Sequence, residues 1–181
     1  NENSQYDPRS PYSASKASSV HLVKAWHHTY GLPILITNCS NNFGPWQFPE
    51  KLIPNVILKA IDQQDIPIYG NGGNIRDWLF VEDHVDAILK VVSKGSIGET
   101  YCIGSNNEKT NLEIAKSICE IIDNLLPIQI PRTNLIKFVE DRPGHDRRYA
   151  IDNSKIKNKL KWQPNNSFNE SFQKTIKWYL N

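Results

Sequence analysis

Residues 11–30 carry apolar side chains at a helical interval, at Ala14, Ala17, Val20, Val23 and Tyr30. Ser10 is a residue type that caps helix N-termini, Pro11 suits the first helical position, and Gly31 suits the position after the last turn. The pattern therefore predicts one long helix over residues 11–30.

Short apolar runs and further helical patterns alternate along the rest of the chain. The predicted strands cover residues 32–37, 67–70, 76–81, 99–104 and 136–141. The predicted helices cover 52–64, 84–92, 111–126, 154–162 and 168–180, and the expected caps are Asp83, Thr110 with Glu113, Asp152, and Ser167 with Glu170. Residues 38–51 are predicted to form a polar and aromatic loop, and residues 70–74 a hairpin-like turn. This alternation predicts an α/β chain with parallel strand pairing.

Charge and composition narrow the functional classes. The chain has 21 basic and 19 acidic residues and a net charge of +2, which is too balanced for a protein that binds nucleic acid by neutralising phosphates. No apolar run approaches the roughly 20 residues of a membrane span. Four lysines between residues 155 and 161 fall on a predicted helix, where a solvated face is the favoured interpretation. We therefore expect neither a nucleic-acid partner nor a membrane.

The cysteine and methionine counts bear on the compartment and on completeness. Cys39, Cys102 and Cys119 are far apart and odd in number, which favours free thiols in a reducing, cytoplasmic compartment. The chain contains no methionine, so we expect it to be a processed chain or a piece of a longer protein. No metal site is expected, because His27 and His28 have no evident third ligand.

Tyr12 and Lys16 are the first candidate catalytic residues. Positions four residues apart share one face of a helix, so the two side chains are expected to point the same way. An ammonium group beside a phenol stabilises the phenolate, which can then remove a proton from a substrate hydroxyl. The alternative is that these are two ordinary neighbours on an exposed helix, since this spacing is common. The small residues between and after them leave space for a flat cofactor or a close helix neighbour.

Longer motifs are more specific than this pair. The stretches "YSASK", "NCSNNFGPWQFPEKLIP", "PIYGNGGNIRDWLFVEDHVDAI" and "DRPGHDRRYAID" occur in that order. Together they resemble the dTDP-glucose 4,6-dehydratases, a family of the extended short-chain dehydrogenase/reductase superfamily. The resemblance runs from about Tyr6 to Tyr179. Phe43, Trp46 and Phe80 stand where tyrosine is usual in the family, which preserves the aromatic surface but removes three hydroxyl groups.

The resemblance implies a fold and a missing portion. It implies the C-terminal half of a Rossmann-type parallel sheet with a smaller α/β substrate-binding subdomain. Residues 1–45 would belong to the NAD-binding domain, and residues 46–181 mainly to the sugar-nucleotide-binding subdomain, with returns to the sheet. The family's Gly-rich NAD fingerprint and its adjacent Asp-Glu acid–base pair have no match here. This implies that the chain alone is inactive.

The resemblance also implies a reaction, an internal redox cycle with NAD. Tyrosinate removes the proton of the sugar C4 hydroxyl while hydride passes to NAD+. The resulting ketone acidifies C5, water is then lost across C5 and C6, and the hydride returns to C6. Tyr12 would be the C4 base, and Lys16 its electrostatic partner and a ligand of the cofactor ribose. Asn42 would lie where this loop meets the cofactor.

Substrate-binding residues are likewise implied, for a dTDP-sugar. Arginines such as Arg76 and Arg142 suit a diphosphate because guanidinium groups bind phosphate oxygens in a bidentate manner. The implied set is Asn41, Lys51, Leu52, Pro67, Ile68, Tyr69, Arg76, Asn111, Asp141, Arg142, Pro143, Gly144 and His145. Structural alternatives remain open for single members: the two asparagines as turn formers, Arg76 with Asp77 as a surface ion pair, and Pro143-Gly144 as a plain turn.

The expected function is therefore dehydration of dTDP-glucose to dTDP-4-keto-6-deoxyglucose, a step of deoxysugar biosynthesis of the rhamnose or O-antigen type. One alternative is another nucleotide-sugar epimerase or decarboxylase of the superfamily, and "QFPEKLIP" speaks against it. The other is a non-catalytic half-protein that binds sugar nucleotides. The resemblance further implies a homodimer of the full-length protein, with the outer face of the 11–30 helix, including Trp26, packed on the partner.

Overall fold

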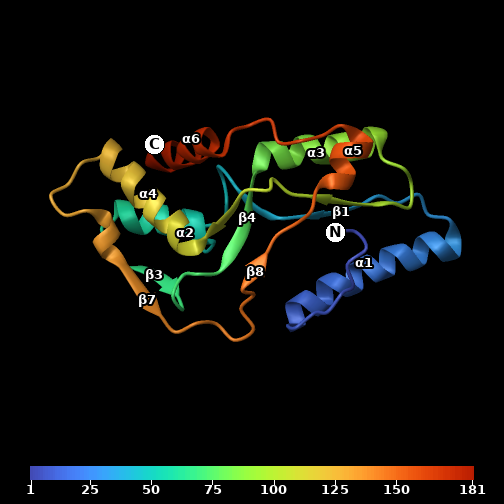
Figure 1. Ribbon diagram of the computed structural model, residues 1–181, viewed down its shortest axis with the longest axis horizontal. Coiled ribbons are helices and arrows are strands. Elements are labelled where there is room, and N and C mark those ends of the chain that lie inside the picture. The colour runs from blue at the N-terminus through green and yellow to red at the C-terminus, as the bar shows by residue number, and fades with distance from the viewer.

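The computed structural model describes all 181 residues, which alternate between helices and short strands (Figure 1). The helices are α1 (Pro11–Tyr30), α2 (Leu52–Ile61), α3 (Val81–Lys94), α4 (Asn111–Leu125), α5 (Ser154–Leu160) and α6 (Phe168–Leu180), with a 3₁₀ turn, η1, at Arg132–Leu135. The strands are β1 (Ile36–Cys39), β2 (Asn41–Phe43), β3 (Ile66–Tyr69), β4 (Ile75–Phe80), β5 (Thr100–Ile103), β6 (Glu108–Thr110), β7 (Ile136–Val139) and β8 (Arg148–Tyr149). None of the helices is both long and apolar enough to cross a membrane.

The strands form three small sheets. β1 pairs with β5, and β3 pairs with β7, both in parallel. In the third sheet β6 runs antiparallel to β4 along residues 75–77, while β8 runs parallel to residues 75–76 of the same strand. β2 pairs in parallel with residues 78–80. Because a strand has only two edges and β2 and β6 flank β4, β8 and β2 lie end to end along one edge of β4.

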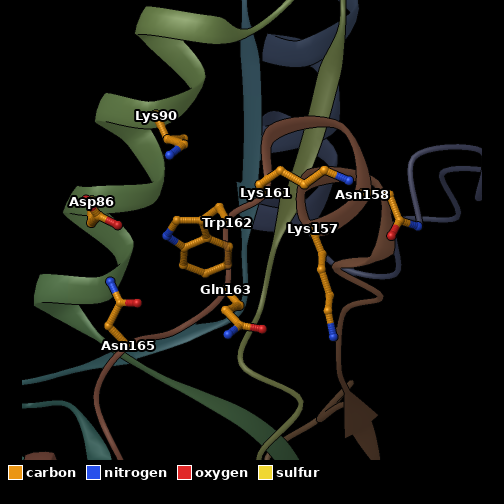
Figure 2. A pocket seen from close by; sticks show the side chains of 8 residues that line it. All are labelled: Asp86, Lys90, Lys157, Asn158, Lys161, Trp162, Gln163 and Asn165. Carbon is orange, nitrogen blue, oxygen red and sulfur yellow. The ribbon is translucent and has the colours of Figure 1, made fainter.

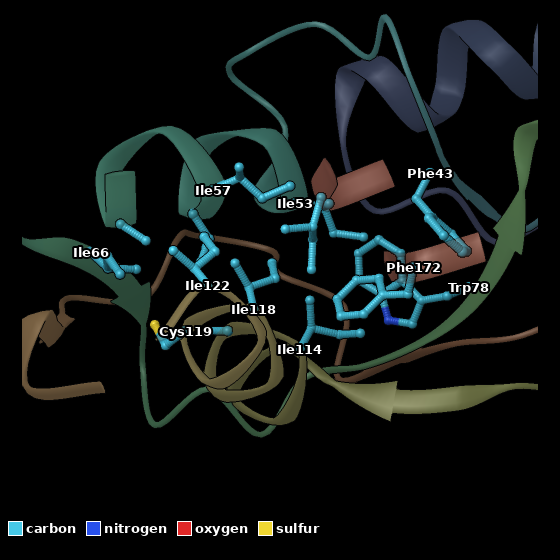
Figure 3. Packing of buried hydrophobic residues seen from close by; sticks show 14 of the residues in the cluster. Phe43, Ile53, Ile57, Ile66, Trp78, Ile114, Ile118, Cys119, Ile122 and Phe172 are labelled. Carbon is cyan, nitrogen blue, oxygen red and sulfur yellow. The ribbon is translucent and has the colours of Figure 1, made fainter. Parts of the chain in front are cut away.

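Strand β4 also separates two hydrophobic cores. Successive side chains of a strand point to opposite faces, so Trp78 and Phe80 enter one core and Leu79 enters the other. The larger core lies between α2, α4, α6 and β3, where the side chains of Ile118 and Phe172 are buried (Figure 3). The smaller core is formed by α3, α5 and β5. The two cores occupy the two ends of the elongated molecule in Figure 1, with β4 between them.

Helix α1 begins and ends as predicted but contributes little to either core. The Ser10 hydroxyl accepts a hydrogen bond from the Ser13 amide at 3.1 Å, and Gly31 closes the helix with a φ of 68°. Ala17 is its only buried residue. Leu22 and Trp26 remain 62% and 55% exposed, so the helix presents an apolar surface to solvent.

Several predicted boundaries differ from the structure. The strand predicted at residues 32–37 runs instead from Ile36 to Cys39, because pairing with β5 decides which main-chain groups bond. The predicted loop 38–51 therefore contains the end of β1 and all of β2. The chain does turn after β3, where the Gly72 amide donates to the Tyr69 carbonyl at 3.1 Å, but the turn closes no hairpin because β3 and β4 belong to different sheets. The short strands β6 and β8 were not predicted, because neither has an apolar run of its own.

The predicted caps met different outcomes. Thr110 and Glu113 form both bonds of a capping box at α4, as predicted. Ser167 accepts only the bond from the Glu170 amide, at 3.3 Å. Asp83 does not cap α3, which begins two residues earlier at Val81. Asp152 lies one residue before the cap position of α5, which is Asn153. The Asp152 carboxylate nevertheless accepts a hydrogen bond from the Ser154 amide at 2.8 Å.

Candidate functional site

Four of the predicted substrate residues meet at the end of β3, in what we call the Arg142 cluster: Tyr69, Asp141, Arg142 and His145. The Arg142 guanidinium lies 4.8 Å from the centre of the Tyr69 ring. Its Nη2 is 3.1 Å from Nε2 of His145, whose Nδ1 is 2.6 Å from the Asp141 carboxylate. The cluster thus joins a flat aromatic surface to a fixed positive charge.

The bonds within the cluster fix the state of His145. Arginine has no acceptor, so Nε2 of His145 must accept the hydrogen from Arg142. Nδ1 is then the ring nitrogen that donates a hydrogen bond to the Asp141 carboxylate. This bond is the largest cause of a lowered pKa at the Asp141 carboxyl. Because the His145 side chain is 6% exposed, the arrangement holds Arg142 in place beside Tyr69.

Two glycines allow the loop between β7 and β8, residues 140–147, to approach β3. Gly70 has a φ of 56°, and a Cβ atom there would stand 3.1 Å from the Asp141 carboxylate, so a larger residue would strain both backbone and contact. Gly144 has a φ of 67°, in the turn closed by the bond from the His145 amide to the Arg142 carbonyl. Pro143-Gly144 therefore does form a turn, and it presents both Arg142 and His145 to Tyr69.

Arg76 approaches the same region from β4. Its Nη2 donates to the Asp146 carbonyl at 2.9 Å, and the Asn74 side chain donates to the same oxygen at 3.2 Å. Burial lowers the pKa of Arg76, and the positive charge of Arg142 lowers it further, while Asp146 opposes this. Arg76 and Arg142 thus both contribute positive charge to this region, which suits an anionic ligand.

Arg76 is not paired with Asp77, which excludes the surface ion pair considered above. Asp77 is fully buried on the opposite face of β4. It accepts hydrogen bonds from the Ser105 amide and hydroxyl and from the Asn107 amide, at 3.1, 2.7 and 2.9 Å. Asp77 therefore anchors the 105–107 loop and does not neutralise the charge of Arg76.

The two asparagines of β2 have side-chain oxygens that accept no hydrogen bond within the protein. The side-chain oxygens of Asn41 and Asn42 are buried and have no hydrogen-bond partner, and neither has the hydroxyl of Ser40. Asn42 Nδ2 lies 3.3 Å from Cys39 Sγ. The main-chain carbonyl of Asn42 accepts a hydrogen bond from the Gln47 side chain at 2.9 Å. Both asparagines belong to a paired strand, so they are not turn formers. Buried oxygens that lack a donor fit a ligand with hydroxyl or amide hydrogens.

Tyr12 and Lys16 lie on the exposed first half of α1. The Tyr12 side chain is 75% exposed, and the Lys16 ammonium forms no ion pair. Tyr149 links β8 to the end of β1, since its hydroxyl donates to the Cys39 carbonyl at 3.2 Å. Burial raises the pKa of Tyr149, and Tyr12 adds a smaller contribution in the same direction.

The remaining predicted residues are more scattered. Lys51 caps α2 by position and forms a surface ion pair with Glu50 at 2.9 Å, and Leu52 packs against the larger core. Pro67 is half-buried and Ile68 buried on β3, so Tyr69 is the exposed member of that strand. Asn111 begins α4, where its amide donates to the Asn74 carbonyl at 3.0 Å.

Known proteins place this arrangement in a family. The family model described as GDP-mannose 4,6 dehydratase matches residues 1–175. The chain belongs to this family. A family member named dTDP-glucose 4,6-dehydratase from Xanthomonas campestris is 55% identical over 99% of the chain, and one from Escherichia coli is 58% identical over 99%. The chain spans about half the length of these curated relatives, 52% and 51% respectively.

Solved structures of the family share the fold. The chain is similar to a dTDP-glucose 4,6-dehydratase from Bacillus anthracis in complex with NAD, with a TM-score of 0.90 and 45% identity over 99% of the chain and 55% of that structure. A dTDP-glucose 4,6-dehydratase from Streptomyces venezuelae with NAD and TYD bound gives a TM-score of 0.91 and 41% identity, covering 99% and 53%. The expected Rossmann-type α/β fold is therefore confirmed.

The sequence did not reveal three residues whose side chains donate hydrogen bonds to main-chain carbonyls of the candidate site. Asn74 was interpreted only as part of a turn, although it holds the Asp146 carbonyl together with Arg76. Tyr149 and Gln47 hold Cys39 and Asn42 respectively. The only sequence signal was their position within or beside the family motifs, because each acts on a carbonyl group that any residue could supply.

Proposed function

We propose that the intact protein converts dTDP-glucose to dTDP-4-keto-6-deoxyglucose with NAD as cofactor, in deoxysugar biosynthesis. The observation that carries the proposal is the Arg142 cluster, in which the Arg142 guanidinium lies 4.8 Å from the centre of the exposed Tyr69 ring. The Arg76 guanidinium reaches the same loop, where it donates to the Asp146 carbonyl at 2.9 Å. Two guanidinium groups suit a diphosphate, and the exposed ring suits a flat base. The names of the relatives and the NAD in the similar solved structures support the same assignment.

The residues present also fit NAD. When bound, NAD would accept a hydride from the sugar and later return it. Tyr12 as phenolate would remove the proton of the C4 hydroxyl, and the Lys16 ammonium would stabilise the phenolate and hydrogen-bond the cofactor ribose. The unpartnered oxygens of Asn41 and Asn42 would accept hydrogens, Asn41 from substrate and Asn42 where the cofactor meets the loop. The other residues proposed to line the substrate are Lys51, Leu52, Pro67, Ile68, Asn111, Asp141, Pro143, Gly144 and His145.

The proposal extends to organisation. Residues 1–45 would complete an NAD-binding domain, and residues 46–181 would mainly bind the sugar nucleotide, with returns to the sheet such as β5, which pairs with β1. This chain has no counterpart of the Gly-rich fingerprint or of the Asp-Glu pair that the elimination requires. We therefore expect the 181-residue chain to be inactive by itself, and turnover by that chain alone would contradict this part.

Assembly and location are proposed on separate grounds. The exposed apolar side chains of α1, including Leu22 and Trp26, support a homodimer formed through this helix. Sedimentation of the intact protein as a monomer at high concentration would contradict it. The three unpaired cysteines support a reducing, cytoplasmic location.

Replacement of Tyr12 tests the catalytic assignment. In the intact protein, Tyr12→Phe should lower kcat by roughly 10²- to 10⁴-fold with little change in the affinity for dTDP, because only the proton acceptor is lost. Tyr30→Phe is the matched control, since Tyr30 lies on the same helix and is 71% exposed. Equal turnover of both variants would remove Tyr12 from this role.

The product distinguishes the alternatives. A dehydratase yields a dTDP-sugar lighter by one water, whereas an epimerase yields a product of unchanged mass and a decarboxylase releases carbon dioxide from a sugar acid. Mass spectrometry of the dTDP-glucose reaction separates these outcomes. Binding of dTDP without any conversion would favour a non-catalytic sugar-nucleotide-binding protein.

A further inference from the structure

A polar hollow lies between α3 and the end of α5, within the smaller-core half of the chain and lined by none of the proposed substrate or cofactor residues. Its volume is about 450 Å³, within the range of small-molecule sites. The residues that line it are Asp86, Lys90, Lys157, Asn158, Lys161, Trp162, Gln163 and Asn165 (Figure 2). Three of these are lysines and one is an aspartate, so the lining carries a net positive charge.

A buried donor in this hollow lacks an acceptor. Trp162 is 3% exposed and packs into the smaller core, yet its indole Nε1 has no hydrogen-bond partner. Figure 2 shows this nitrogen directed toward α3, on the side of Asp86 and Lys90. Tryptophan nitrogen can only donate, and a buried donor without an acceptor costs about 1–3 kcal/mol. The site therefore favours a ligand that brings an acceptor oxygen.

The surrounding charges favour an anionic acceptor. Lys90, Lys157 and Lys161 take part in none of the ion pairs of the protein, so their charges are not neutralised internally. Asn158, Gln163 and Asn165 add amide groups that donate to oxygen. Asp86 opposes an anion but accepts hydrogens, so it suits a ligand that also carries a hydroxyl group.

One wall of the hollow is fixed before any ligand arrives. Asp83 is buried on α3 and accepts the amide of Asn165 at 3.0 Å and the side-chain amide of Asn166 at 2.8 Å. This ties the chain that follows Trp162 to α3, and a fixed wall lowers the entropy lost on binding.

We propose that this hollow binds a phosphate group, free or in a small phosphate ester, with Trp162 Nε1 as a neutral donor and Lys90, on the same side of the indole in Figure 2, as a charged one, while the long side chains of Lys157 and Lys161 turn toward the group from the end of α5. Phosphate has several acceptor oxygens and forms its strongest hydrogen bonds with charged donors. The site is separate from the proposed substrate-binding residues, so it can be occupied whether or not the proposed reaction takes place.

The indole ¹⁵N–¹H signal of Trp162 in the intact protein reports on this site directly, and Trp162→Phe assigns the signal. Titration with inorganic phosphate should shift it saturably, while chloride at matched ionic strength should not. Lys157→Gln with Lys161→Gln should weaken binding by at least about tenfold, because two charged donors are lost. Lys116→Gln with Lys159→Gln is the matched control, since neither lysine lines the hollow and both are exposed.

The outcomes separate cleanly. No saturable shift of the Trp162 signal, or equal affinity in both double variants, would overturn the proposal. Glycerol 3-phosphate distinguishes the two sources of the group. Tighter binding than inorganic phosphate identifies an ester whose hydroxyls reach Asp86, and equal binding identifies the phosphate group alone. Because the readout is one local signal, phosphate bound at the proposed nucleotide site does not imitate the result.

Discussion

Arg132 joins the C-terminal ends of two helices inside the larger-core half of the protein. Its side chain is 4% exposed and donates from Nε to the Ala60 carbonyl of α2 at 2.8 Å. Its Nη1 donates to the Asp123 carboxylate at 2.7 Å and to the Leu126 carbonyl at 2.8 Å, both at the end of α4. Carbonyls at helix C-termini lack intrahelical partners and carry partial negative charge, so a buried cation there satisfies several groups at once.

Arg132→Met keeps the length of the side chain and removes these three hydrogen bonds. Losing one partner of a buried ion pair costs about 3–5 kcal/mol, because the other partner stays buried and unpaired. Asp123 is 23% exposed, so water compensates it in part, whereas the Ala60 carbonyl loses a buried donor. We therefore expect the opening of α4 away from α2 to become easier by about 3–4 kcal/mol.

The thiol of Cys119 measures this opening in the intact protein. Cys119 is fully buried, one helical turn before Asp123, and burial raises the pKa of its thiol to about 11. It reacts with a thiol reagent only when α4 opens, so its labelling rate reports the opening free energy. About 3 kcal/mol corresponds to labelling faster by roughly 10²-fold. Removing the Arg132 charge would by itself raise the pKa of Cys119 and slow labelling, so electrostatics cannot imitate the expected change.

Lys174→Met is the matched control, because it removes an ion pair that is exposed on both sides. Lys174 lies 2.6 Å from Glu82, and both side chains are more than half exposed. Exposed pairs contribute about 0–1 kcal/mol, so Cys119 labelling should change by less than about fivefold. If Arg132→Met accelerated labelling no more than this control does, Arg132 would not clamp the two helices.

Two further predictions concern helix ends and pH. Thr110→Ala should reduce the hydrogen-exchange protection of α4 by about 1 kcal/mol, whereas Ser167→Ala should affect α6 less, because only Thr110 forms both bonds of a capping box; equal losses would contradict this. The hydrogen bond from Lys155 lowers the pKa of Glu99 in the folded protein below its value in the unfolded chain. The pair therefore stabilises the fold fully above the unfolded-state pKa, and this stabilisation is lost as the pH falls through the folded-state pKa. The stability difference between the parent protein and Glu99→Gln should therefore shrink between about pH 6 and about pH 3, from at most about 1 kcal/mol, since Glu99 is 42% exposed; a constant difference in urea unfolding would refute it.

The sequence was most informative where a local signal decides the structure. The bounds of α1 were predicted because Ser10, Pro11 and Gly31 each act on the nearest turn of the helix. The capping box of α4 was predicted for the same reason. The interpretation of Asp83 failed because a carboxylate near a helix start can bond to any segment nearby. Here it bonds to residues 165 and 166, more than eighty positions away in the chain.

The candidate site was predictable only in part. The family motifs indicated Tyr69, Arg142 and His145, and the structure brings these side chains together. Their mutual bonds could not be predicted, because they depend on the parallel pairing of β3 with β7, which sets where the following loop begins. The charge lining the hollow beside Trp162 was visible in the sequence as lysines on a solvated face. Its concave shape and its buried donor were not, because α3 supplies the other wall.

Strand β4 explains why residues so distant in sequence share one site. β2 and β8 lie end to end along the same edge of β4, with Asn41 opposite Trp78 and Tyr149 opposite Arg76. Main-chain hydrogen bonds therefore set the spacing between the unpartnered amide oxygens and the Arg76 guanidinium, while the side chains of β4 alternate into the two cores. The site lies at the boundary of both cores, so the packing of each one helps to fix the same strand. A rigid strand held from both sides provides the fixed geometry that a precise binding site requires.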